Sequence, residues 1–572
     1  MFSIIHVYIQ KNRKELDEKP HTPGPHLLGR LESLSEVHSL FTLVTAVIIS
    51  VFLIALLFKE PNHYMAKIIN LLPTSGILII LGMFSGIISY YSDKYFHTNL
   101  SPIHIPAEIL QHVLIFPILL YTSYKLYSQQ FLRQFKSVVI LSVFGTILNV
   151  LLTGLLLTFI HDASWIPSMT ILQSMVFASC ISVVDPLAVV AVFNGAREAK
   201  GNYFLPFGSA LFGYGVAMEL FKAANILAMF GEDDEIPMSS YLFVITSNFT
   251  DPVLGILIGV SCGLVSAAIT RYISIECEYF EPVVTLGCAL FGYVLCVDFG
   301  FSYIFATISC GLVQERYTFM NMSPKSVMST ENIIFALSVI SELLMFVLVG
   351  YLVVYVGFYD VWDFAIAAII IIYTIRMFVT LGLSLILNVF RLSTISFKWQ
   401  LLIFGGHRGP MSLAMIVAYV GPFHELFKEA TLLVIVFSVM VDGVICRYIA
   451  THLKLRRDFQ QSAANNLLVQ SSIYGGGELG NLLGMAKRTN YFLVIERIIF
   501  RFFIADKDKL TNVYRMQLKQ KKRQFFQLLE KHSSKHDERG KIEVLVEGHG
   551  SLDAVDMEVD SIRAGAGFSY VQ

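Results

Sequence analysis

The sequence is poor in charge. Only 15% of its 572 residues are Asp, Glu, Lys or Arg, whereas 55% are hydrophobic and the mean hydropathy is +0.64. A soluble globular domain carries roughly 25% charged residues, so the composition excludes that class and is typical of a membrane protein. The formal net charge of -1 gives no reason to expect a nucleic-acid partner.

Several motifs are also missing. The seven cysteines lack CxxC or Cys/His metal-binding spacing, so we interpret them as reduced packing residues. No P-loop, nucleophile–base set or metal-ligand cluster is recognisable, and we therefore predict neither an enzyme nor a cofactor. The start MFSIIHVYI precedes the charged run QKNRKELDEK instead of following a basic region, so we expect no cleavable signal peptide.

Long apolar runs, by contrast, are abundant. Runs with the length needed to cross a bilayer lie at 41–58, 67–91, 104–127, 135–160, 170–193, 204–229, 252–270, 280–299, 301–315, 333–358, 362–388, 399–420 and 429–449. We therefore predict an all-α polytopic membrane protein with about thirteen transmembrane helices. Six spans, a linker span and six more would set the second six upside down relative to the first, so we predict an inverted repeat of six.

Basic residues gather in alternate loops between these spans. Lys125, Arg133 and Arg316 belong to the richer set of loops, whereas the other set carries Lys94 and Lys428. Lysine and arginine favour the cytoplasmic side, which places the C-terminal tail in the cytoplasm. We divide the chain into an N-terminal extracellular or peripheral segment, a transmembrane domain, membrane-proximal cytoplasmic regulatory helices and a flexible C-terminal tail, at 1–40, 41–450, 451–532 and 533–572.

Two of the spans contain a break. SVVDPLAVVAVF (182–193) holds Asp185 followed by Pro186, and GGHRGP (405–410) holds Arg408. Proline removes a backbone donor and clashes with the preceding turn, and a broken helix is tolerated in a membrane only where it is packed in protein or lines a wet cavity. Interrupted segments at corresponding places of two halves indicate a transport site. We therefore predict two interrupted, crossing helices with Asp185 as the cation site.

Each of these polar residues also has a purely structural interpretation. Asp185 could be a helix-end packing device, although a carboxylate near the bilayer centre costs ~2.5–3.5 kcal/mol and the second break favours function. We interpret Arg408 as a cation that balances the dipoles of opposed helix ends. His407 is explained equally well as a packed polar residue and as a pH sensor.

Six motifs carry a resemblance to a known family: SVVDPLAVVAVF (182–193), PFGSALFGYGVAMELF (206–221), FEPVVTLGCALFGYV (280–294), SELLMFVLVG (341–350), TIRMFVTLGL (374–383) and GGHRGPMSLAM (405–415). In them the sequence resembles the animal sodium/proton exchangers, the plasma-membrane type in particular. The resemblance implies exchange of Na⁺, or another monovalent cation, for H⁺. It further implies a homodimer in the plasma membrane, a part in intracellular pH and sodium regulation, and no cofactor beyond the transported ions.

One carboxylate is enough to couple the exchange that the resemblance implies. Asp185 would either coordinate a cation or be protonated, and competition between the two ions would couple their gradients. The Ser182 hydroxyl lies one turn earlier, and carbonyls freed at Pro186 would complete an oxygen shell suited to a hard cation.

The sixth span departs from the family pattern. Where the family reads Phe-Gly-Glu-Ser-Leu-Leu-Asn-Asp, this chain reads FGSALFGY, so Ser209, Gly213 and Tyr214 replace the acid, the asparagine and the carrier aspartate. An ordinary tyrosine ionises only near pH 10. Tyr214 therefore cannot alternate between a cation-binding anion and a neutral form at ordinary pH.

Three explanations for this departure remain open. Asp185 alone could suffice for exchange. Glu219 could substitute, although it lies five positions beyond Tyr214, about 140° around an ideal helix, and Lys222 at i+3 is its natural ion-pair partner. Alternatively, the chain keeps the fold but is transport-impaired and serves as a regulatory or dimerising partner. A channel is the second transport class.

Two further charges depend on the same substitution. In the family, Arg376 would pair with the acid that is here Ser209, so we expect Glu342 or Glu219 to take over in a structural pair. Glu342 with Ser341 resembles a family site, but it could also simply neutralise an arginine.

The tail offers two candidate contact segments. ANNLLVQSSIYGGGELGNLLG, residues 464–484, aligns with the segment through which plasma-membrane relatives bind a calcineurin B-like EF-hand protein. Its three consecutive glycines disfavour a helix by ~1 kcal/mol each. A second segment supplies a basic cluster that we expect to meet anionic lipid at about 1 kcal/mol per cation, namely Lys519, Lys521, Lys522 and Arg523.

Overall fold

The structure is a computed structural model of the whole chain, and it describes residues 74–96, 107–160, 169–186, 204–228, 238–273, 278–356, 361–390 and 407–445. Several predictions lie outside these residues and stay predictions. They concern the N-terminal segment 1–40, the first span 41–58, the tail segments 451–532 and 533–572, the 464–484 partner segment and the basic cluster at 519–523.

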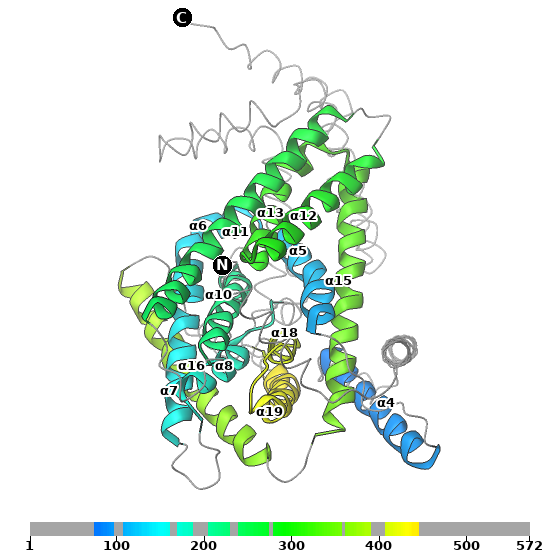
Figure 1. Cartoon of the computed structure of the whole chain (residues 1–572). Coiled ribbons are helices and arrows are strands. Elements are labelled where there is room, and N and C mark those ends of the chain that lie inside the picture. Colours follow the sequence, from blue (N-terminus) through cyan, green and yellow to red (C-terminus); the bar gives the residue numbers. More distant parts are fainter. Residues whose placement is uncertain are drawn as a thin grey trace, which may run out of the picture.

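All the regular structure among the described residues is helical (Figure 1). The α-helices are α4 (Thr74–Phe96), α5 (Ile115–Leu126), α6 (Gln129–Val139), α7 (Gly145–Ile160), α8 (Ile171–Ser182), α10 (Phe204–Ala228), α11 (Met238–Tyr272), α12 (Phe280–Phe299), α13 (Tyr303–Val313), α14 (Phe319–Asn321), α15 (Pro324–Val353), α16 (Val361–Val389), α18 (Met411–Ile416) and α19 (His424–Phe437). Wider π-helical turns continue some of them, namely η1 (Ile109–Leu114), η2 (Ile140–Phe144), η4 (Gln314–Thr318) and η5 (Ser438–Asp442).

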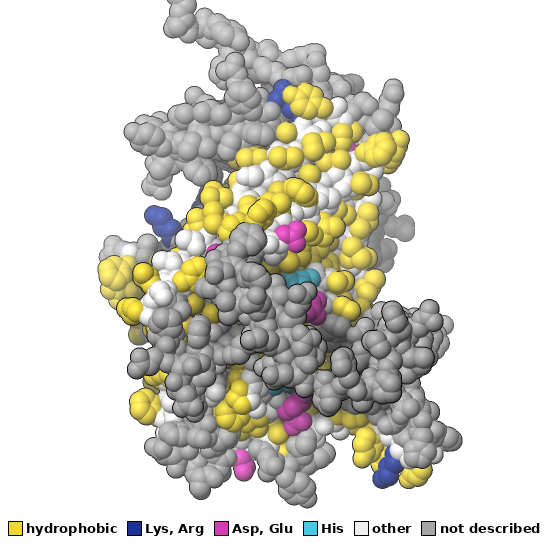
Figure 2. Space-filling view, viewed as in Figure 1, with side chains coloured by type: hydrophobic (Ala, Val, Ile, Leu, Met, Phe, Trp, Pro, Cys, Tyr) yellow, Lys and Arg dark blue, Asp and Glu magenta, His cyan; other side chains and the backbone are white. Residues whose placement is uncertain are grey.

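Eight of the described helical segments are long and apolar enough to cross a membrane. Apolar side chains are spread over the outside of the molecule (Figure 2), and many of them are exposed, including Val283 and Phe291 on α12. An apolar exterior is what lipid tails require. The prediction of an all-helical, multi-pass membrane protein is therefore confirmed, whereas the thirteen spans, the inverted repeat and the cytoplasmic helical tail stay predictions.

One helix is much longer than its predicted span. α11 begins at Met238 and runs through Pro252, whereas the apolar run begins only at 252. The added turns are rich in Ser and Thr, and these side chains bond to their own helix: Thr246 Oγ1 donates to Leu242 O at 2.8 Å, for example. These bonds satisfy the polar side chains within the helix. The Ser and Thr residues therefore belong to the helix, although in the sequence they look like part of a loop.

The helices form two groups with a short pair between them (Figure 1). In one group α11, α12 and α13 pack together, and α5 packs on α13 and α15. In the other, α7, α8, α10 and α16 are neighbours. The pair α18 and α19 contacts α8 on one side, and α19 also contacts α15 and α16. The two sequence breaks are thereby brought to the middle of the molecule.

Small residues set the closest helix contact in the first group. Gly255, Gly259 and Gly263 recur every fourth position on α11, so they share one face, and that face lies against α13. A Cβ at Gly259 would overlap the backbone oxygen of Ala306. Helices in lipid gain their attraction from such close packing, because burial from lipid offers no hydrophobic gain.

Candidate functional site

The break at Asp185 is a true end of helix α8. The helix starts with a capping box, in which Thr170 and Gln173 satisfy each other's backbone N–H groups, and it ends at Ser182. Val183 is then extended, with φ -62° and ψ 135°. The backbone N–H of Asp185 donates to His407 O at 2.9 Å. A backbone group freed by the first break is therefore satisfied by the second, as membrane burial demands.

Arg408 closes the same junction from the other side. Its Nη1 donates to Ser182 O at 2.8 Å and to Val183 O at 3.1 Å, and only 1% of the residue is exposed. These carbonyls belong to the C-terminal end of α8, where a helix carries partial negative charge. The geometry is that of a cation placed at a helix end.

The Asp185 side chain lies within the protein, with 2% of the residue exposed. Gly409 lies directly against it, since a Cβ at this glycine would overlap the Asp185 carboxylate. Glu342, half-buried on α15, lies close enough for its charge to interact with that of Asp185. Pro186 follows Asp185 and is buried as well. The site thus brings two acidic side chains near one helix break.

π-helical turns supply polar partners that the sequence analysis missed. From η5, Ser438 Oγ accepts from Arg408 N at 2.7 Å, and Asp442 Oδ2 lies 3.2 Å from His407 Nδ1. Gln111 in η1 donates through Nε2 to Ala414 O at 2.9 Å. Such turns occur often at functional sites, and the intramembrane acid in VIVFSVMVD was the available signal for the first of them.

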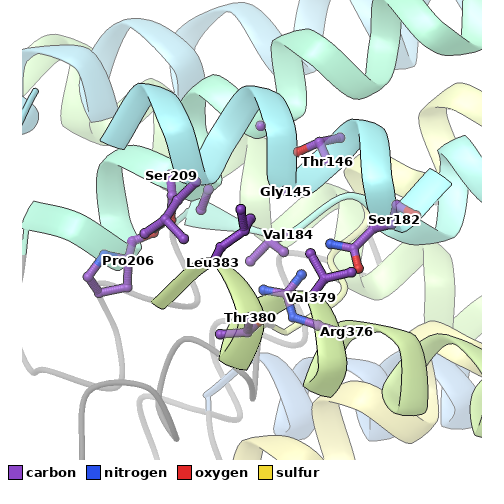
Figure 3. Close-up of a pocket in the computed structure, with 14 residues that line it drawn as sticks. Gly145, Thr146, Ser182, Val184, Pro206, Ser209, Arg376, Val379, Thr380 and Leu383 are labelled. Carbon is purple, nitrogen blue, oxygen red and sulfur yellow. Dashed lines mark hydrogen bonds between the residues drawn. The ribbon is translucent and has the colours of Figure 1, made fainter. Parts of the chain in front are cut away.

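A cavity of about 50 Å³ lies beside the break. Figure 3 shows Arg376 extending from α16 toward it, below Ser182 and Val184. The lining comes from η2, α7, the end of α8, α10 and α16: Leu141, Gly145, Thr146, Asn149, Ser182, Val184, Pro206, Ser209, Ala210, Gly213, Arg376, Val379, Thr380 and Leu383. It therefore joins four of the residues singled out in the sequence, namely Ser182, Ser209, Gly213 and Arg376.

Other residues singled out in the sequence lie apart from this cavity. Tyr214 is fully buried, and its phenol lies among Tyr293, Tyr303 and Cys180 instead of lining the cavity. On the same helix, Glu219 forms the ion pair expected with Lys222 (Oε1 to Nζ, 3.3 Å). The Lys222 ammonium also lies 5.5 Å from the centre of the Tyr303 ring.

No resident metal site is visible in the part of the chain that the structure describes, where no three His, Cys, Asp or Glu side chains gather. What the junction offers instead is oxygen: carboxylates, the Ser182 hydroxyl and backbone carbonyls. Oxygen ligands suit a hard cation, whereas the guanidinium of Arg408 keeps charge balanced at the helix ends. The arrangement can hold a proton or a small cation on a buried carboxylate.

Known proteins share this sequence and fold. The family described as "Sodium/hydrogen exchanger, transmembrane" matches residues 48–452. The Na(+)/H(+) exchanger protein 7 of Caenorhabditis elegans is 28% identical over 420 residues, covering 71% of this chain and 52% of that protein. Sodium/hydrogen exchanger 2 of Oryctolagus cuniculus is also 28% identical over 420 residues, covering 72% and 51%. The chain thus spans about half the length of these curated relatives.

A solved structure supports the fold. That of the sodium proton antiporter MjNhaP1 from Methanocaldococcus jannaschii matches with a TM-score of 0.52 at 16% identity, covering 72% of this chain and 96% of that one. The family match alone covers well over half of the sequence, and members of this family are secondary transporters instead of enzymes. The chain belongs to the sodium/hydrogen exchanger family, whose transmembrane domain matches residues 48–452.

Proposed function

We propose that the protein exchanges Na⁺, or another monovalent cation, for H⁺ across a membrane. The observation that carries the proposal is the Asp185 carboxylate, buried where two helix breaks are joined by the bond from Asp185 N to His407 O. An ionisable group in a membrane interior is costly and marks ion pathways. A cation and a proton compete for this one group, and the competition couples their gradients.

The surrounding residues support this role. Ser182 and the carbonyls around Pro186 offer oxygen ligands, and Glu342 adds a second acidic side chain close to Asp185. Arg408 holds the end of α8, so the break keeps its shape while the ion changes. Ser209 and Gly213 contribute no carboxylate, so the proposal assigns the binding of both ions to Asp185.

Several finer points belong to the same proposal. We infer from the family resemblance that the protein works as a homodimer in the plasma membrane, with its tail in the cytoplasm, and that it serves intracellular pH and sodium regulation. Anionic lipid and a calcineurin B-like EF-hand protein are the proposed contacts of the tail.

Proton-coupled flux tests the main proposal. The full chain is reconstituted in proteoliposomes, and Na⁺ or Li⁺ uptake is driven by an imposed proton gradient. We expect saturable uptake that reverses with the gradient, and Asp185→Asn should lower it to the level of empty liposomes. The matched control is Asp363→Asn, an exposed acid near the start of α16, which should keep the wild-type rate. Full exchange by Asp185→Asn would refute the proposal.

The second candidate function is that of a transport-impaired partner with an exchanger fold. It is favoured by the cavity, whose described lining residues include Ser209 and Gly213 but no carboxylate. A folded, dimeric wild-type protein with no flux under either gradient would support it. Current that does not saturate and needs no proton gradient would instead indicate a channel.

A further inference from the structure

The cavity beside the break has a polar lining with one sign of charge. Of the described residues that line it, Arg376 is the charged one. The other polar side chains on its wall are those of Thr146, Asn149, Ser182, Ser209 and Thr380. Hydroxyl and amide groups can donate hydrogen bonds, and a guanidinium has five donors and no acceptor. Ser209 already donates its hydrogen to Pro206 O at 3.0 Å, so the donors that the wall can offer are the Arg376 guanidinium and the remaining hydroxyl and amide groups.

A second cation adds to the positive charge. Arg408, fully buried at the helix junction, lies close enough to Arg376 for the two charges to repel each other. Guanidinium groups stay protonated in proteins, so neither arginine relieves this repulsion by losing a proton. Asp442 also lies close enough to Arg408 for their charges to attract each other. An anion in the cavity would be attracted by the Arg376 guanidinium on its wall.

Two buried side chains on the wall have a hydrogen-bonding atom with no partner among the described groups. These atoms are Asn149 Oδ1 and Ser182 Oγ, on residues that are only 8% and 5% exposed. A serine hydroxyl can turn its hydrogen toward any acceptor, and an asparagine amide has a donor end as well as an acceptor end. Buried polar atoms in proteins rarely lack a partner, so these two indicate a ligand or ordered water in the cavity.

The size of the cavity limits what it can hold. A cavity needs a volume of about 10–15 Å³ to hold one water molecule, and this cavity has a volume of about 50 Å³. This is enough for one monatomic anion with a water or two. An organic phosphate or a nucleotide would not fit.

We propose that this cavity is a binding site for a small monovalent anion such as chloride, held by the Arg376 guanidinium and by hydrogen bonds from Ser182 and Asn149. The Asp185 carboxylate is not among the lining residues, although Ser182 belongs both to this cavity and to the proposed cation site. The proposal concerns binding and does not rest on ion exchange. It stands or falls by a measurement that needs no transport.

Thermal unfolding of the purified full chain in detergent measures the binding. Sodium gluconate is replaced stepwise by sodium chloride, so that Na⁺ and ionic strength stay constant. A ligand that binds only the folded state raises the unfolding midpoint in a saturable way. We expect a rise of about 2–4 °C at saturation. A midpoint that does not respond to chloride would overturn the proposal.

Two variants place the effect at the cavity. Arg376→Gln removes the guanidinium and should abolish the chloride response. Arg133→Gln, an exposed arginine on α6, is the matched control and should keep it. In Ser209→Glu the new carboxylate shares the cavity with Arg376 from the opposite helix, so it should take the anion's place and make the midpoint independent of chloride.

The three variants also distinguish binding at the cavity from a general effect of salt on stability. An equal chloride response in Arg376→Gln and Arg133→Gln would mean a general salt effect and would refute the site. Should Arg376→Gln fail to fold, Ser209→Glu decides alone: a full chloride response in that variant would refute the site, and its loss would support it.

Discussion

The phenol of Tyr214 lies inside the packing of α10, with 0% of the residue exposed, and its hydroxyl has no hydrogen-bond partner among the described groups. Removing an unsatisfied hydroxyl costs little, since no bond is lost. We therefore expect Tyr214→Phe to unfold at the wild-type temperature or slightly above it, and to transport at the wild-type rate. A fall in flux of tenfold or more would show that the hydroxyl takes part in transport.

The reverse change at the same position should fail. Tyr214→Asp restores the acid of the family pattern, but it places a carboxylate among Tyr293, Tyr303 and Cys180 and outside the cavity. An unpaired charge in such a place costs several kcal/mol. We expect a lower unfolding midpoint and no gain in flux, measured on the same samples as Tyr214→Phe. A stable variant with faster exchange would contradict this account.

Gly409 tests the geometry around Asp185 without changing any charge. A Cβ at this position would overlap the Asp185 carboxylate, so Gly409→Ala should displace the carboxylate or the backbone that holds it. Small displacements at a reaction site can cost about 100-fold in rate. We expect the initial rate of Na⁺-driven proton flux to fall about 10- to 100-fold.

The control for this change is Gly382→Ala, because a Cβ there would meet nothing within 4 Å. That variant should keep the wild-type rate. Equal rates in the two alanine variants would show that the Asp185 carboxylate is not confined by residue 409.

Single residues were predictable from the sequence where their chemistry is unusual for a membrane span. Asp185, Arg376 and Arg408 stand out as charges in apolar runs, and the structure places all three at the junction or its cavity. The sequence did not predict which face of α10 lines the cavity, because apolar residues occur all around this helix. Whether Tyr214 or Gly213 lines the cavity depends on how α10 packs against α7. The hydrophobic periodicity of the sequence does not predict this packing.

At the scale of elements, close contact between α11 and α13 depends on Gly259. Its Cβ in an alanine variant would overlap Ala306 O and Ser309 Oγ, so one helix must move. Overpacking of this kind costs typically 1–3 kcal/mol. We expect Gly259→Ala to lower the unfolding midpoint by several degrees, as measured by size-exclusion chromatography of heated samples.

Gly287 on α12 provides the matched helix control, since an added Cβ there would meet open space. Alanine at this position should leave the midpoint unchanged or raise it slightly, because alanine is the better helix former. If Gly259→Ala and Gly287→Ala unfold at the same temperature, the α11–α13 contact is not tightly packed.

Helix positions followed from apolar runs, but helix details did not. The span 280–299 was predicted with the bounds that α12 has in the structure. The bounds of α11 were not, because the helix continues before the apolar run through turns rich in Ser and Thr, whose side chains bond to their own helix. The π-helical turns that bring Ser438 and Asp442 to the junction depend on tertiary contacts. The sequence marks Asp442 as an acid in an apolar run, but it does not mark the π-helical turn that carries this acid.

At the scale of the whole molecule, the two halves of the chain meet at one buried junction. The first half contributes the end of α8 and Asp185, and the second contributes His407, Arg408 and the start of α18. Neither break satisfies its backbone groups alone, because the partner atoms lie more than two hundred positions away. The bonds from Arg408 to Ser182 O and Val183 O therefore tie the second break to the end of α8.

The orientation of the whole molecule can be tested by the exposure of its ends. The excess of lysine and arginine predicts that the loop before α15 is cytoplasmic and the loop before α19 is external. Lys325 and Glu425 report on these two ends, since their side chains are 77% and 70% exposed. We expect a membrane-impermeant maleimide to label Glu425→Cys on intact cells. Lys325→Cys should react only after the membrane is opened.

The labelling needs a background without reactive native thiols. Cys180, Cys262, Cys296 and Cys310 are buried and should stay unreactive, so they can remain. The background then replaces by serine Cys277, Cys288 and Cys446. Labelling of Lys325→Cys on intact cells, with Glu425→Cys protected until permeabilisation, would invert the orientation and place the tail outside. Labelling of both on intact cells would contradict the predicted number of spans between the two positions, because an odd number must separate opposite sides.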